Sequence, residues 1–597
     1  MGQFFKNVFA STLGTIIAMG IMWVISLFVI IWVIKSVAGE VKDFNPTKKQ
    51  VSITDDAILK ISLSHAVVEK SDENPLQGIE LPVELFIQKS GVVNIVSAIR
   101  NATNNENVKA ILLDLGIVNA GLPQLAEIRS ALELFKKTSQ KPVYAYGEYM
   151  SEKSYYLASV ADKVYITPEG IVEFNGFSTE LIFFKGLFEK LGVEPKIFKV
   201  GKFKSAVEPF FRKDMSEANR LQVSRFLESM YGEVLSKISK NRGVSVVELR
   251  NIANELLVQN PMDAVKHKLI DGAKYYDEVI ELLKTNIGVD VNQEMQLLST
   301  SDLSNTSFDL ATGGDKVAVV IAEGEIVSGT SSDGKLGSTS FIKNLNEAVK
   351  DEDIKAIVIR INSPGGSALA SDVMWHAIRV AREKKPVIAS MSSLAASGGY
   401  YMAAACDEII AHPHTITGSI GVFGILVELD ELLENKIGIT TDRVKTGRFA
   451  DIGMPTRKFT EEESNIIQQN VNRTYQTFIT KVAEGRGMTV NAVDAVASGR
   501  VWTGKDAQTK GLVDELGGLN LALSKAAEKA SLGDGYEVEY FPKNQMLFNF
   551  STSPLSIRLS EVTGIAIPEL NKILQAYHRL QNSNGVQARM AFDVEVK

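Results

Sequence analysis

Two glycine-rich turns and one serine carry residue types that could perform acyl transfer. Ser397 stands in the run AASGGY, which is typical of a strand-to-helix turn where the hydroxyl is exposed and the following N–H groups are free. The run NSPGGS at 362–367 follows a strand-like stretch, and its glycines let backbone N–H groups point at a ligand. We therefore expect Ser397 to act as a nucleophile. The N–H groups of Gly366 and Gly398 would form the oxyanion hole, with Gly365 as the alternative to Gly366.

The candidate base for that serine is Lys204, in the run GKFKS at 201–205. A Ser–Lys pair is an accepted variant of a serine and its base, and it needs no histidine. Lysine titrates near pH 10.4 in water, so acting as a base around pH 7 requires its pKa to fall by about three units, roughly 4 kcal/mol. Burial would supply that shift, and we expect apolar and backbone surroundings for Lys204 rather than a carboxylate. Ser419, in the run TGSIG, is a candidate to hydrogen-bond and orient Lys204.

Other interpretations of these residues stay open. A serine among alanines and glycines often caps a helix, a lone lysine is usually solvated, and Ser419 could be an ordinary turn serine. His412 and His414 follow Ser397 by 15 and 17 residues and would be needed by a Ser–His site, although surface or turn positions suit them better. No GxSxG surrounds any serine, which disfavours the nucleophile elbow of α/β-hydrolases.

The elements that must position these residues occur twice along the chain. Val108–Leu112 matches Ile354–Val358 at an offset of 246, and later features repeat at offsets of 244 to 246. In each copy, short β-rich runs alternate with amphipathic helices, which predicts an α/β fold. A long polar helix is expected in both copies, near 216–241 and 460–484, as an arm that packs on a neighbouring domain or subunit.

The repeats divide the chain into five segments. The polar run STSDLSNTSFDLATGGD lacks periodicity and is interpreted as a linker between the copies. We expect an N-terminal stub with a membrane anchor, a first repeat, this linker, a second repeat and a C-terminal tail without a recognisable motif, at 1–45, 55–295, 299–315, 316–535 and 536–597.

The two copies have lost complementary parts. The first copy carries GIVNAG at 116–121 where the second has NSPGGS, and Glu152 and Lys153 stand where the second has its serine turn. Conversely, only the first copy has the second lysine of GKFKS, because the second copy reads GRFAD at 447–451. This pattern predicts one composite site, in which the second copy supplies the nucleophile and oxyanion donors and the first copy supplies Lys204.

The composition excludes several other classes of protein. Lys plus Arg (64) minus Asp plus Glu (71) gives −7 and a pI near 5.7, so no global positive field exists to hold nucleic acid. The single cysteine, Cys406, lies in an alanine-rich apolar run that suits a core residue. One cysteine can form neither an intramolecular disulfide nor a cysteine-based zinc site. We expect no cofactor and no metal.

The N-terminus predicts a membrane protein. Residues 13–34 form an uncharged apolar run of 22 residues, the length of a transmembrane helix. A cleaved secretory signal is the alternative, since a small-x-small site follows at 36–38, but the run is too long for an ordinary signal core. Flanking charges place the short N-terminal side in the cytoplasm, though weakly. We therefore expect a single-pass protein of the inner (cytoplasmic) membrane with a large extracytoplasmic, periplasmic body.

The anchor, the tandem repeat and the motifs GKFKSAVEPF, NSPGGS, AASGGYY and TGSIGV together resemble the long form of the bacterial signal peptide peptidase A (protease IV) family, from the anchor to about residue 535. The resemblance implies a ClpP/crotonase-like fold in each half and a Ser–Lys dyad split between the halves, with Ser397 as nucleophile and Lys204 as general base. Gly366 and Gly398 match its oxyanion positions. It further implies a homotetramer with enclosed active sites and cleavage of signal peptides left in the membrane. Such extended peptides could dock by strand addition.

Two other classes of function stay open beside this resemblance. A crotonase-like acyl-CoA enzyme predicts catalytic carboxylates and a basic nucleotide-binding loop, and it leaves the anchor and the Ser–Lys pair unexplained. A non-catalytic envelope scaffold would have lost its site as the first copy has. The presence of Ser397, Gly366 and Lys204 argues against a scaffold.

Overall fold

The computed structural model describes residues 53, 56–71, 89–304, 314–533, 535–543 and 586–590. The chain divides into two units, Met1–Ile53 and Thr54–Lys597, and all helices and strands of the described residues belong to the second. The predicted transmembrane run at 13–34 lies outside the described residues. Among the residues that are described, no helix combines the length and the apolar character that crossing a bilayer requires.

The first copy is built on a parallel sheet with the strand order β8-β6-β5-β4-β1-β9. Its central strand β4 carries the continuous apolar run AILL, as expected for a parallel sheet with both faces covered. The strands are β1 (Ala57–Ser62), β4 (Val108–Asp114), β5 (Val143–Met150), β6 (Lys163–Val172), β8 (Gly272–Ala273) and β9 (Gln296–Leu298), with β2 (Val67–Val68) and β3 (Ser90–Gly91) paired separately.

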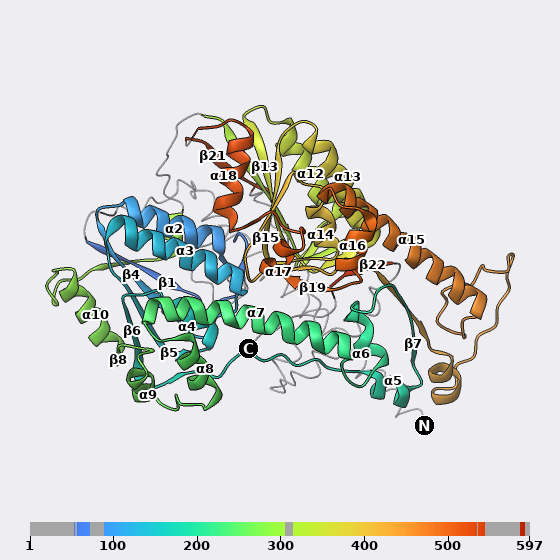
Figure 1. Cartoon of the computed structure of the whole chain (residues 1–597), viewed down its shortest axis with the longest axis horizontal. Helices are drawn as coiled ribbons and strands as arrows, with labels where there is room; N and C mark the ends of the chain where they lie inside the picture. Colours follow the sequence, from blue (N-terminus) through green and yellow to red (C-terminus); the bar gives the residue numbers. More distant parts are fainter. Residues whose placement is uncertain are drawn as a thin grey trace, which may run out of the picture. The chain divides into compact units, whose positions relative to one another are not determined.

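Most helices of the first copy lie around this sheet, whereas α5 and α6 pack on each other beside β7 (Glu194–Lys199), away from the sheet (Figure 1). Helix α10 packs on one face through Val279 and Leu283, which join a core cluster with strand residues. The helices are α2 (Val92–Asn104), α3 (Leu122–Ser139), α4 (Glu152–Ala158), α5 (Lys185–Leu191), α6 (Glu208–Phe211), α7 (Glu217–Arg242), α8 (Val246–Asn254), α9 (Pro261–Lys266), α10 (Tyr276–Asn286) and α11 (Thr300–Ser304), with a 3₁₀ turn η1 (Ser205–Val207).

The second copy repeats the same order, β20-β16-β15-β13-β10-β21, again with parallel pairing throughout. Strand β17 also pairs with β15 and carries the antiparallel β19 at its far side. The α/β fold and its repetition are therefore as predicted. The strands are β10 (Lys316–Glu323), β13 (Ile354–Ser363), β15 (Val387–Ala396), β16 (Glu408–Ala411), β17 (Ile416–Gly418), β19 (Val501–Thr503), β20 (Glu515–Leu516) and β21 (Glu537–Phe541).

Helix α18 covers one face of this second sheet and α12 to α15 lie toward the other, where they share the larger core cluster. The helices are α12 (Ser338–Lys350), α13 (Ala368–Arg382), α14 (Gly398–Ala403), α15 (Glu461–Arg486), α16 (Val490–Val496), α17 (Gly504–Thr509) and α18 (Leu519–Lys529), with a π-turn η2 (Glu431–Lys436).

Each copy extends one strand beyond its predicted limit. Strands β9 and β21 lie at 296–298 and 537–541, past residues 295 and 535, so the segment predicted as a tail begins inside the second sheet. The predicted linker also opens with a helix, α11, which packs on α2 and accepts a 2.6 Å hydrogen bond from Asn101 at Leu303 O. Elements of three to five residues are too short for hydrophobic periodicity to reveal them.

A third sheet joins the two copies, in the order β12-β11-β14-β22-β18-β7. Strand β7 comes from the first copy and pairs antiparallel with β18 of the second, from Lys199–Phe423 to Glu194–Glu428. The strands are β12 (Lys335–Gly337), β11 (Glu325–Val327), β14 (Gly365–Ser367), β22 (Gln587–Arg589), β18 (Phe423–Glu428) and β7 (Glu194–Lys199). Because a strand of one copy completes a sheet of the other, the copies fold as an interlocked pair.

The two long polar helices are α7 and α15, and both begin and end where capping rules place them. Ser216 and Thr460 cap their first turns through side-chain oxygens, and Gly243 and Gly487 end them in left-handed conformations. Helix α7 of the first copy packs on β19 and α17 of the second, with a 3.3 Å ion pair from Arg225 to Asp506. The prediction that these helices pack on a neighbouring domain is confirmed for α7.

A buried charge cluster links the copies beside the NSPGGS turn. Arg360 on β13 pairs with Glu69 of the first copy (Nε to Oε2, 2.6 Å) and with Glu127 of α3 (Nη1 to Oε1, 2.8 Å). Glu323 on β10 accepts hydrogen bonds from the Glu69 N–H at 3.2 Å and from Asn362 Nδ2 at 3.0 Å. Burial raises the pKa of Glu127, and it raises the pKa of Glu323 to about 7. Asn362 is the first residue of the NSPGGS turn, so the cluster holds the start of that turn in place.

We predict that Arg360→Ala destabilises the protein. The substitution leaves the carboxylates of Glu69 and Glu127 buried without their cation, and breaking a buried ion pair in this way costs about 3–5 kcal/mol in the free energy of unfolding. Urea titration followed by circular dichroism measures the change. Arg473→Ala, on the exposed side of α15, is the matched control and should stay within about 0.5 kcal/mol of the parent. A loss below about 1 kcal/mol in Arg360→Ala would show that the cluster does not hold the copies together.

We also predict that Glu323 makes stability depend on pH. With its folded-state pKa raised to about 7, the folded chain keeps a proton that the unfolded chain releases above its usual carboxyl pKa near 4.5. The free energy of unfolding therefore falls as pH rises from about 4.5 to about 7. Glutamine does not titrate. Over this pH range, the unfolding free energy of Glu323→Gln should therefore fall by about 2–3 kcal/mol less than that of the parent. Urea titrations across this pH range test it, and an unchanged slope would contradict it.

Candidate active site

Ser397 lies at the junction of β15 and α14 in a strained conformation. Its φ of 53° and ψ of −110° fall in a region that non-glycine residues rarely adopt. The backbone is held on both sides, since Ser397 N donates to Gly418 O at 2.8 Å and Ser397 O accepts from Tyr401 N at 2.8 Å. Strain held in place by its surroundings is common at functional sites. The predicted strand-to-helix turn is therefore present, and Ser397 is its pivot.

Lys204 of the first copy reaches this serine. Its Nζ lies 2.9 Å from Ser397 Oγ, and 3.1 Å from both the carbonyl oxygen and the Oγ of Ser419. Two glycines of the second copy make room for the lysine stem: a Cβ built on Gly499 would lie 2.6 Å from Lys204 Cβ, and one on Gly421 would lie 3.3 Å from Cδ. The structure thus brings together the three side chains that the sequence predicted for nucleophile, base and orienting group.

The surroundings of Lys204 disfavour a charged amine. The side chain is fully buried, and burial lowers the pKa of Lys204 well below its usual range. Among the described residues no charged neighbour contributes to that shift. The amine lies over the ring of Phe423, whose centroid is 5.9 Å from Nζ. These are the apolar and backbone surroundings predicted from the sequence, and without a carboxylate nearby nothing opposes the effect of burial on this pKa.

The glycines expected to bind an oxyanion lie beside one another. A Cβ on Gly365 would lie 2.6 Å from Gly398 N, and Gly365 itself has a φ of +90°, so only glycine suits the position. The N–H of Gly365 donates to Ser363 Oγ at 3.2 Å, and Gly366 lies opposite Ala588 in the β14–β22 ladder. A Cβ on Gly366 would meet Ile326 O at 2.1 Å. Gly398 is the first residue of α14, so its N–H has no intrahelical partner.

In the first copy, a buried glutamate occupies the position that corresponds to Ser397. Glu152 opens α4 at the position corresponding to Ser397, and its buried carboxylate accepts the N–H groups of Asn175 at 3.2 Å and Gly176 at 2.7 Å. Burial raises the pKa of Glu152 to about 7. A carboxyl group bound by backbone amides offers neither a nucleophilic hydroxyl nor free oxyanion donors. The difference between the copies that the sequence suggested is present in three dimensions.

His412 and His414 were expected at a surface or turn position and lie in a turn, where His414 is buried. Its ring is 2% exposed and packs edge-on against Tyr156 of the first copy, with ring centroids 6.0 Å apart. Burial lowers the pKa of His414 to about 4 and that of His412 well below its usual value. The sequence could not show this because the covering residues come from the other copy. In the described structure, Ser397 Oγ bonds to Lys204 Nζ and, at 3.4 Å, donates to Gly421 O, and its side-chain partner is Lys204 and not a histidine.

One contributor to the site was missed by sequence reasoning. Gly499 lies outside every motif, yet its φ of +77° and its contact with the Lys204 backbone leave no room for a side chain. Its neighbour Arg500 accepts the Ser419 N–H at 2.7 Å, so this short loop supports both Lys204 and Ser419. A lone glycine between polar residues carries no signal of such a contact. Cys406, by contrast, is buried in the core as predicted.

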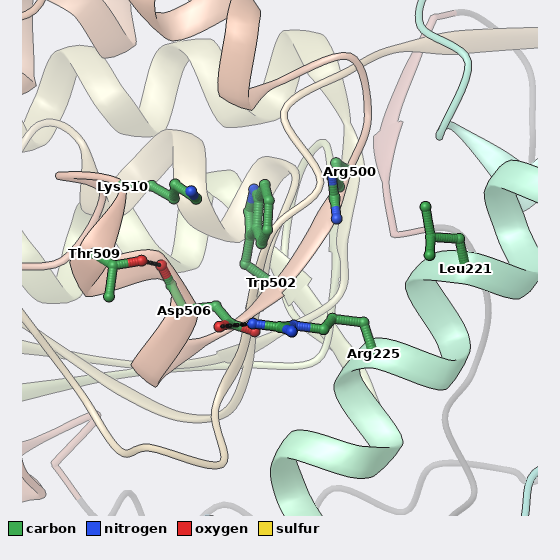
Figure 2. Close-up of a pocket in the computed structure, with 7 residues that line it drawn as sticks. All are labelled: Leu221, Arg225, Arg500, Trp502, Asp506, Thr509 and Lys510. Carbon is green, nitrogen blue, oxygen red and sulfur yellow. Dashed lines mark hydrogen bonds and ion pairs between the residues drawn. The ribbon is translucent and has the colours of Figure 1, made fainter.

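A separate cavity of about 320 Å³ lies where α7 meets the β19–α17 segment (Figure 2). None of the predicted site residues lines it. Leu221 and Arg225 enter it from α7, and the Arg225–Asp506 ion pair crosses it. The remaining lining residues are Arg500, Trp502, Thr509 and Lys510. The cavity lies at the contact between the two copies and is distinct from the Ser397 site.

Both copies of the domain are similar in sequence to known proteins. Residues 135–290 and 379–533, one stretch in each copy, match Peptidase family S49. The chain is 35% identical over 560 residues to Protease 4 of Salmonella typhi, covering 89% of each chain. It is 34% identical over 502 residues to the chloroplastic serine protease SPPA of Arabidopsis thaliana, covering 82% of this chain and 72% of that protein. A solved ClpP1 mutant from Listeria monocytogenes matches 34% of this chain and 94% of its own, at 17% identity and a TM-score of 0.24.

We predict that Lys204→Met stabilises the fold at neutral pH. With its pKa lowered in the folded state, Lys204 binds its proton less tightly in the folded chain than in the unfolded chain, so stability rises with pH toward the unfolded pKa near 10.5. Methionine removes this burial penalty, and the expected gain at pH 7 is on the order of 1–2 kcal/mol, shrinking toward pH 10. Urea titration measures it. Lys202→Met, at the exposed lysine two residues earlier, is the control, and a less stable Lys204→Met would contradict the assignment of a buried neutral amine.

Proposed function

The chain belongs to peptidase family S49 and is a serine peptidase, and we propose that it cleaves extended peptides through a Ser–Lys dyad and an acyl-enzyme. The observation that carries the proposal is the 2.9 Å contact between Lys204 Nζ and Ser397 Oγ, both fully buried and contributed by different copies. Signal peptides left after preprotein processing are the proposed physiological substrates.

In the proposed acylation step, the neutral amine of Lys204 accepts the proton of the Ser397 hydroxyl as Oγ attacks the peptide carbonyl carbon. The two remaining amine hydrogens point to Ser419, whose carbonyl and Oγ accept them at 3.1 Å and so orient the nitrogen lone pair toward Ser397. Lys204 then gives its proton to the departing amine nitrogen. Ser419 is in this view a positioning residue.

The tetrahedral intermediate would be stabilised by the glycine turn. Its oxyanion would accept hydrogen bonds from the N–H groups of Gly366 and Gly398, and one good donor of this kind contributes about 3 kcal/mol to the transition state. In deacylation, Lys204 takes a proton from water, which attacks the acyl-enzyme ester and releases the second peptide. The products are a new carboxylate and a new amine, with one water consumed.

We also propose a membrane location and an oligomeric state for the enzyme. Residues 13–34 would anchor it in the inner membrane, with the catalytic body on the extracytoplasmic side and close to peptides embedded in lipid. A homotetramer with enclosed sites would exclude folded proteins and admit extended chains. Detergent extraction followed by light scattering tests the tetramer, and protease accessibility in membrane vesicles tests the orientation.

The two alternative functions predict different properties for the site. An acyl-CoA enzyme needs a catalytic carboxylate at the site, whereas burial sets the shift of Lys204 without a carboxylate partner among the described residues. A scaffold would leave Ser397 unreactive. Labelling by a serine-directed acylating probe, lost in Ser397→Ala, would exclude the scaffold.

We predict that Ser397→Ala and Lys204→Ala each abolish hydrolysis of a fluorogenic signal-peptide substrate in detergent. Loss of either dyad member should lower kcat/KM by at least about 10³-fold, because the nucleophile and its base act as one unit. Activity of the parent should rise with pH as Lys204 loses its proton and should level off well below pH 10, since burial lowers the pKa of Lys204.

Matched controls are Lys202→Ala, two residues from the base and exposed, and Ser393→Ala, on the strand that leads to the nucleophile. Both should keep activity near that of the parent. Size-exclusion chromatography checks that inactive variants remain folded and assembled. Retained activity in Lys204→Ala would place the base elsewhere and return His412 and His414 to consideration.

A further inference from the structure

The cavity between α7 and the β19–α17 segment gathers positive charge from both copies. Its lining contains three basic side chains, Arg225 on α7 of the first copy and Arg500 and Lys510 of the second. The one carboxylate of the lining is Asp506, which pairs with Arg225 at 3.3 Å. The lining therefore has a formal charge of +2, since three cations face one carboxylate, and Arg500 and Lys510 have no carboxylate of their own within it.

The indole ring of Trp502 holds these two cations in position. The Arg500 guanidinium carbon lies 4.1 Å and Lys510 Nζ lies 5.6 Å from the ring centroid, and Figure 2 shows Trp502 between them. The Arg500 guanidinium also lies 4.8 Å from the ring centroid of Phe203. Contacts with aromatic rings attract and orient a cation, but they leave its N–H groups without an oxygen acceptor.

Arg500 carries a donor that the protein does not satisfy. Its Nε is buried and has no hydrogen-bond partner among the described residues. Burial and the charge of Arg225 lower the pKa of Arg500, and Asp506 opposes this shift. In Figure 2 the Arg500 side chain runs toward the Arg225–Asp506 pair. Because a buried N–H without an acceptor is costly, an anion bound beside Arg500 would supply both the acceptor and the missing negative charge.

The main chain at Arg500 is fixed by the loop that supports the dyad. Arg500 N donates to Ala497 O at 2.9 Å, and Arg500 O accepts the Ser419 N–H at 2.7 Å. The preceding residue is held as well, since Gly499 N donates to Ile420 O at 2.8 Å. A donor on a fixed backbone loses little conformational freedom when a ligand binds. Arg500 is therefore preorganised as a binding residue.

The cavity suits a compact anion better than a peptide. Helix α7 packs along β19, and Gln222 Oε1 accepts the Val501 N–H at 3.2 Å, so this part of the strand edge is not free to pair with an extended chain. The Trp502 N–H already donates to Val496 O at 2.9 Å. The basic side chains remain as donors, and they match a phosphate group, whose charge of about −2 would neutralise the lining and whose oxygens accept several charge-assisted hydrogen bonds.

We propose that this cavity binds a phosphate group, which bridges the two copies by accepting hydrogen bonds from Arg225 of the first and from Arg500 and Lys510 of the second. The inference goes beyond the proposed peptidase function and does not depend on it. Inorganic phosphate, a soluble phosphate monoester and the headgroup of phosphatidic acid share the required chemistry. An occupied site would join the copies beside the loop at 498–500, which contacts both Lys204 and Ser419.

Isothermal titration calorimetry of inorganic phosphate into the full chain in detergent tests the proposal, with the ionic strength held constant by sodium chloride at neutral pH. We expect saturable binding. Arg225→Gln and Lys510→Gln, both at exposed positions, should each weaken it at least about tenfold. Asp506→Asn removes the competing carboxylate and should tighten it about two- to fivefold. Lys505→Gln, on α17 but outside the cavity, is the matched control and should stay within about twofold of the parent.

Further titrations separate the sources of the phosphate. Glycerol phosphate and dihexanoyl phosphatidic acid are compared with inorganic phosphate, and dihexanoyl phosphatidylcholine is the lipid control. Binding of inorganic phosphate that depends on Arg225 and Lys510 supports a site for a soluble ligand, and binding of phosphatidic acid without inorganic phosphate supports a headgroup site. Thermal melting checks that the variants are folded. The proposal is overturned if none of the three phosphates binds, or if Lys505→Gln weakens binding as much as Arg225→Gln and Lys510→Gln do.

Discussion

A single contact between a lysine amine and a serine hydroxyl imposes the architecture of this molecule. Lys204 and Ser397 belong to different copies of one domain, and both are fully buried, so the copies must meet closely enough to exclude water from the pair. A flexible linkage between two globular domains could not hold two atoms at 2.9 Å in a dry site. The strand exchanged between copies, β7 on β18, and the charge cluster around Arg360 provide the rigidity that this contact needs.

The same constraint explains where the fold departs from its most stable form. An amine is buried without an anion, a serine takes a positive φ, and glycines crowd together where any side chain would collide. Each of these features lowers stability in isolation. The extensive cores of the two copies offset them, and in the first copy the corresponding position has been sealed by Glu152 and backbone amides.

Much of this could be predicted from the sequence, because the relevant signals are local. Repeated β-rich runs, glycine turns and the unequal motifs of the copies lie within short windows, and these windows contain Ser397, Lys204 and Ser419. Other features depend on tertiary contacts that leave no local pattern. The burial of His414 needs the other copy, Gly499 matters only through the lysine that lies against it, and β22 is a three-residue strand without periodicity.

The interlocked site has a consequence for the order of biosynthesis. A ribosome that has made Lys204 must still make Ser397, and then the loop at Gly499 that backs the lysine, before the site can exist. A chain that is still incomplete therefore lacks the Ser–Lys pair, and its own unfolded segments are not exposed to it. The order of synthesis itself therefore delays the assembly of the dyad until both copies have been made.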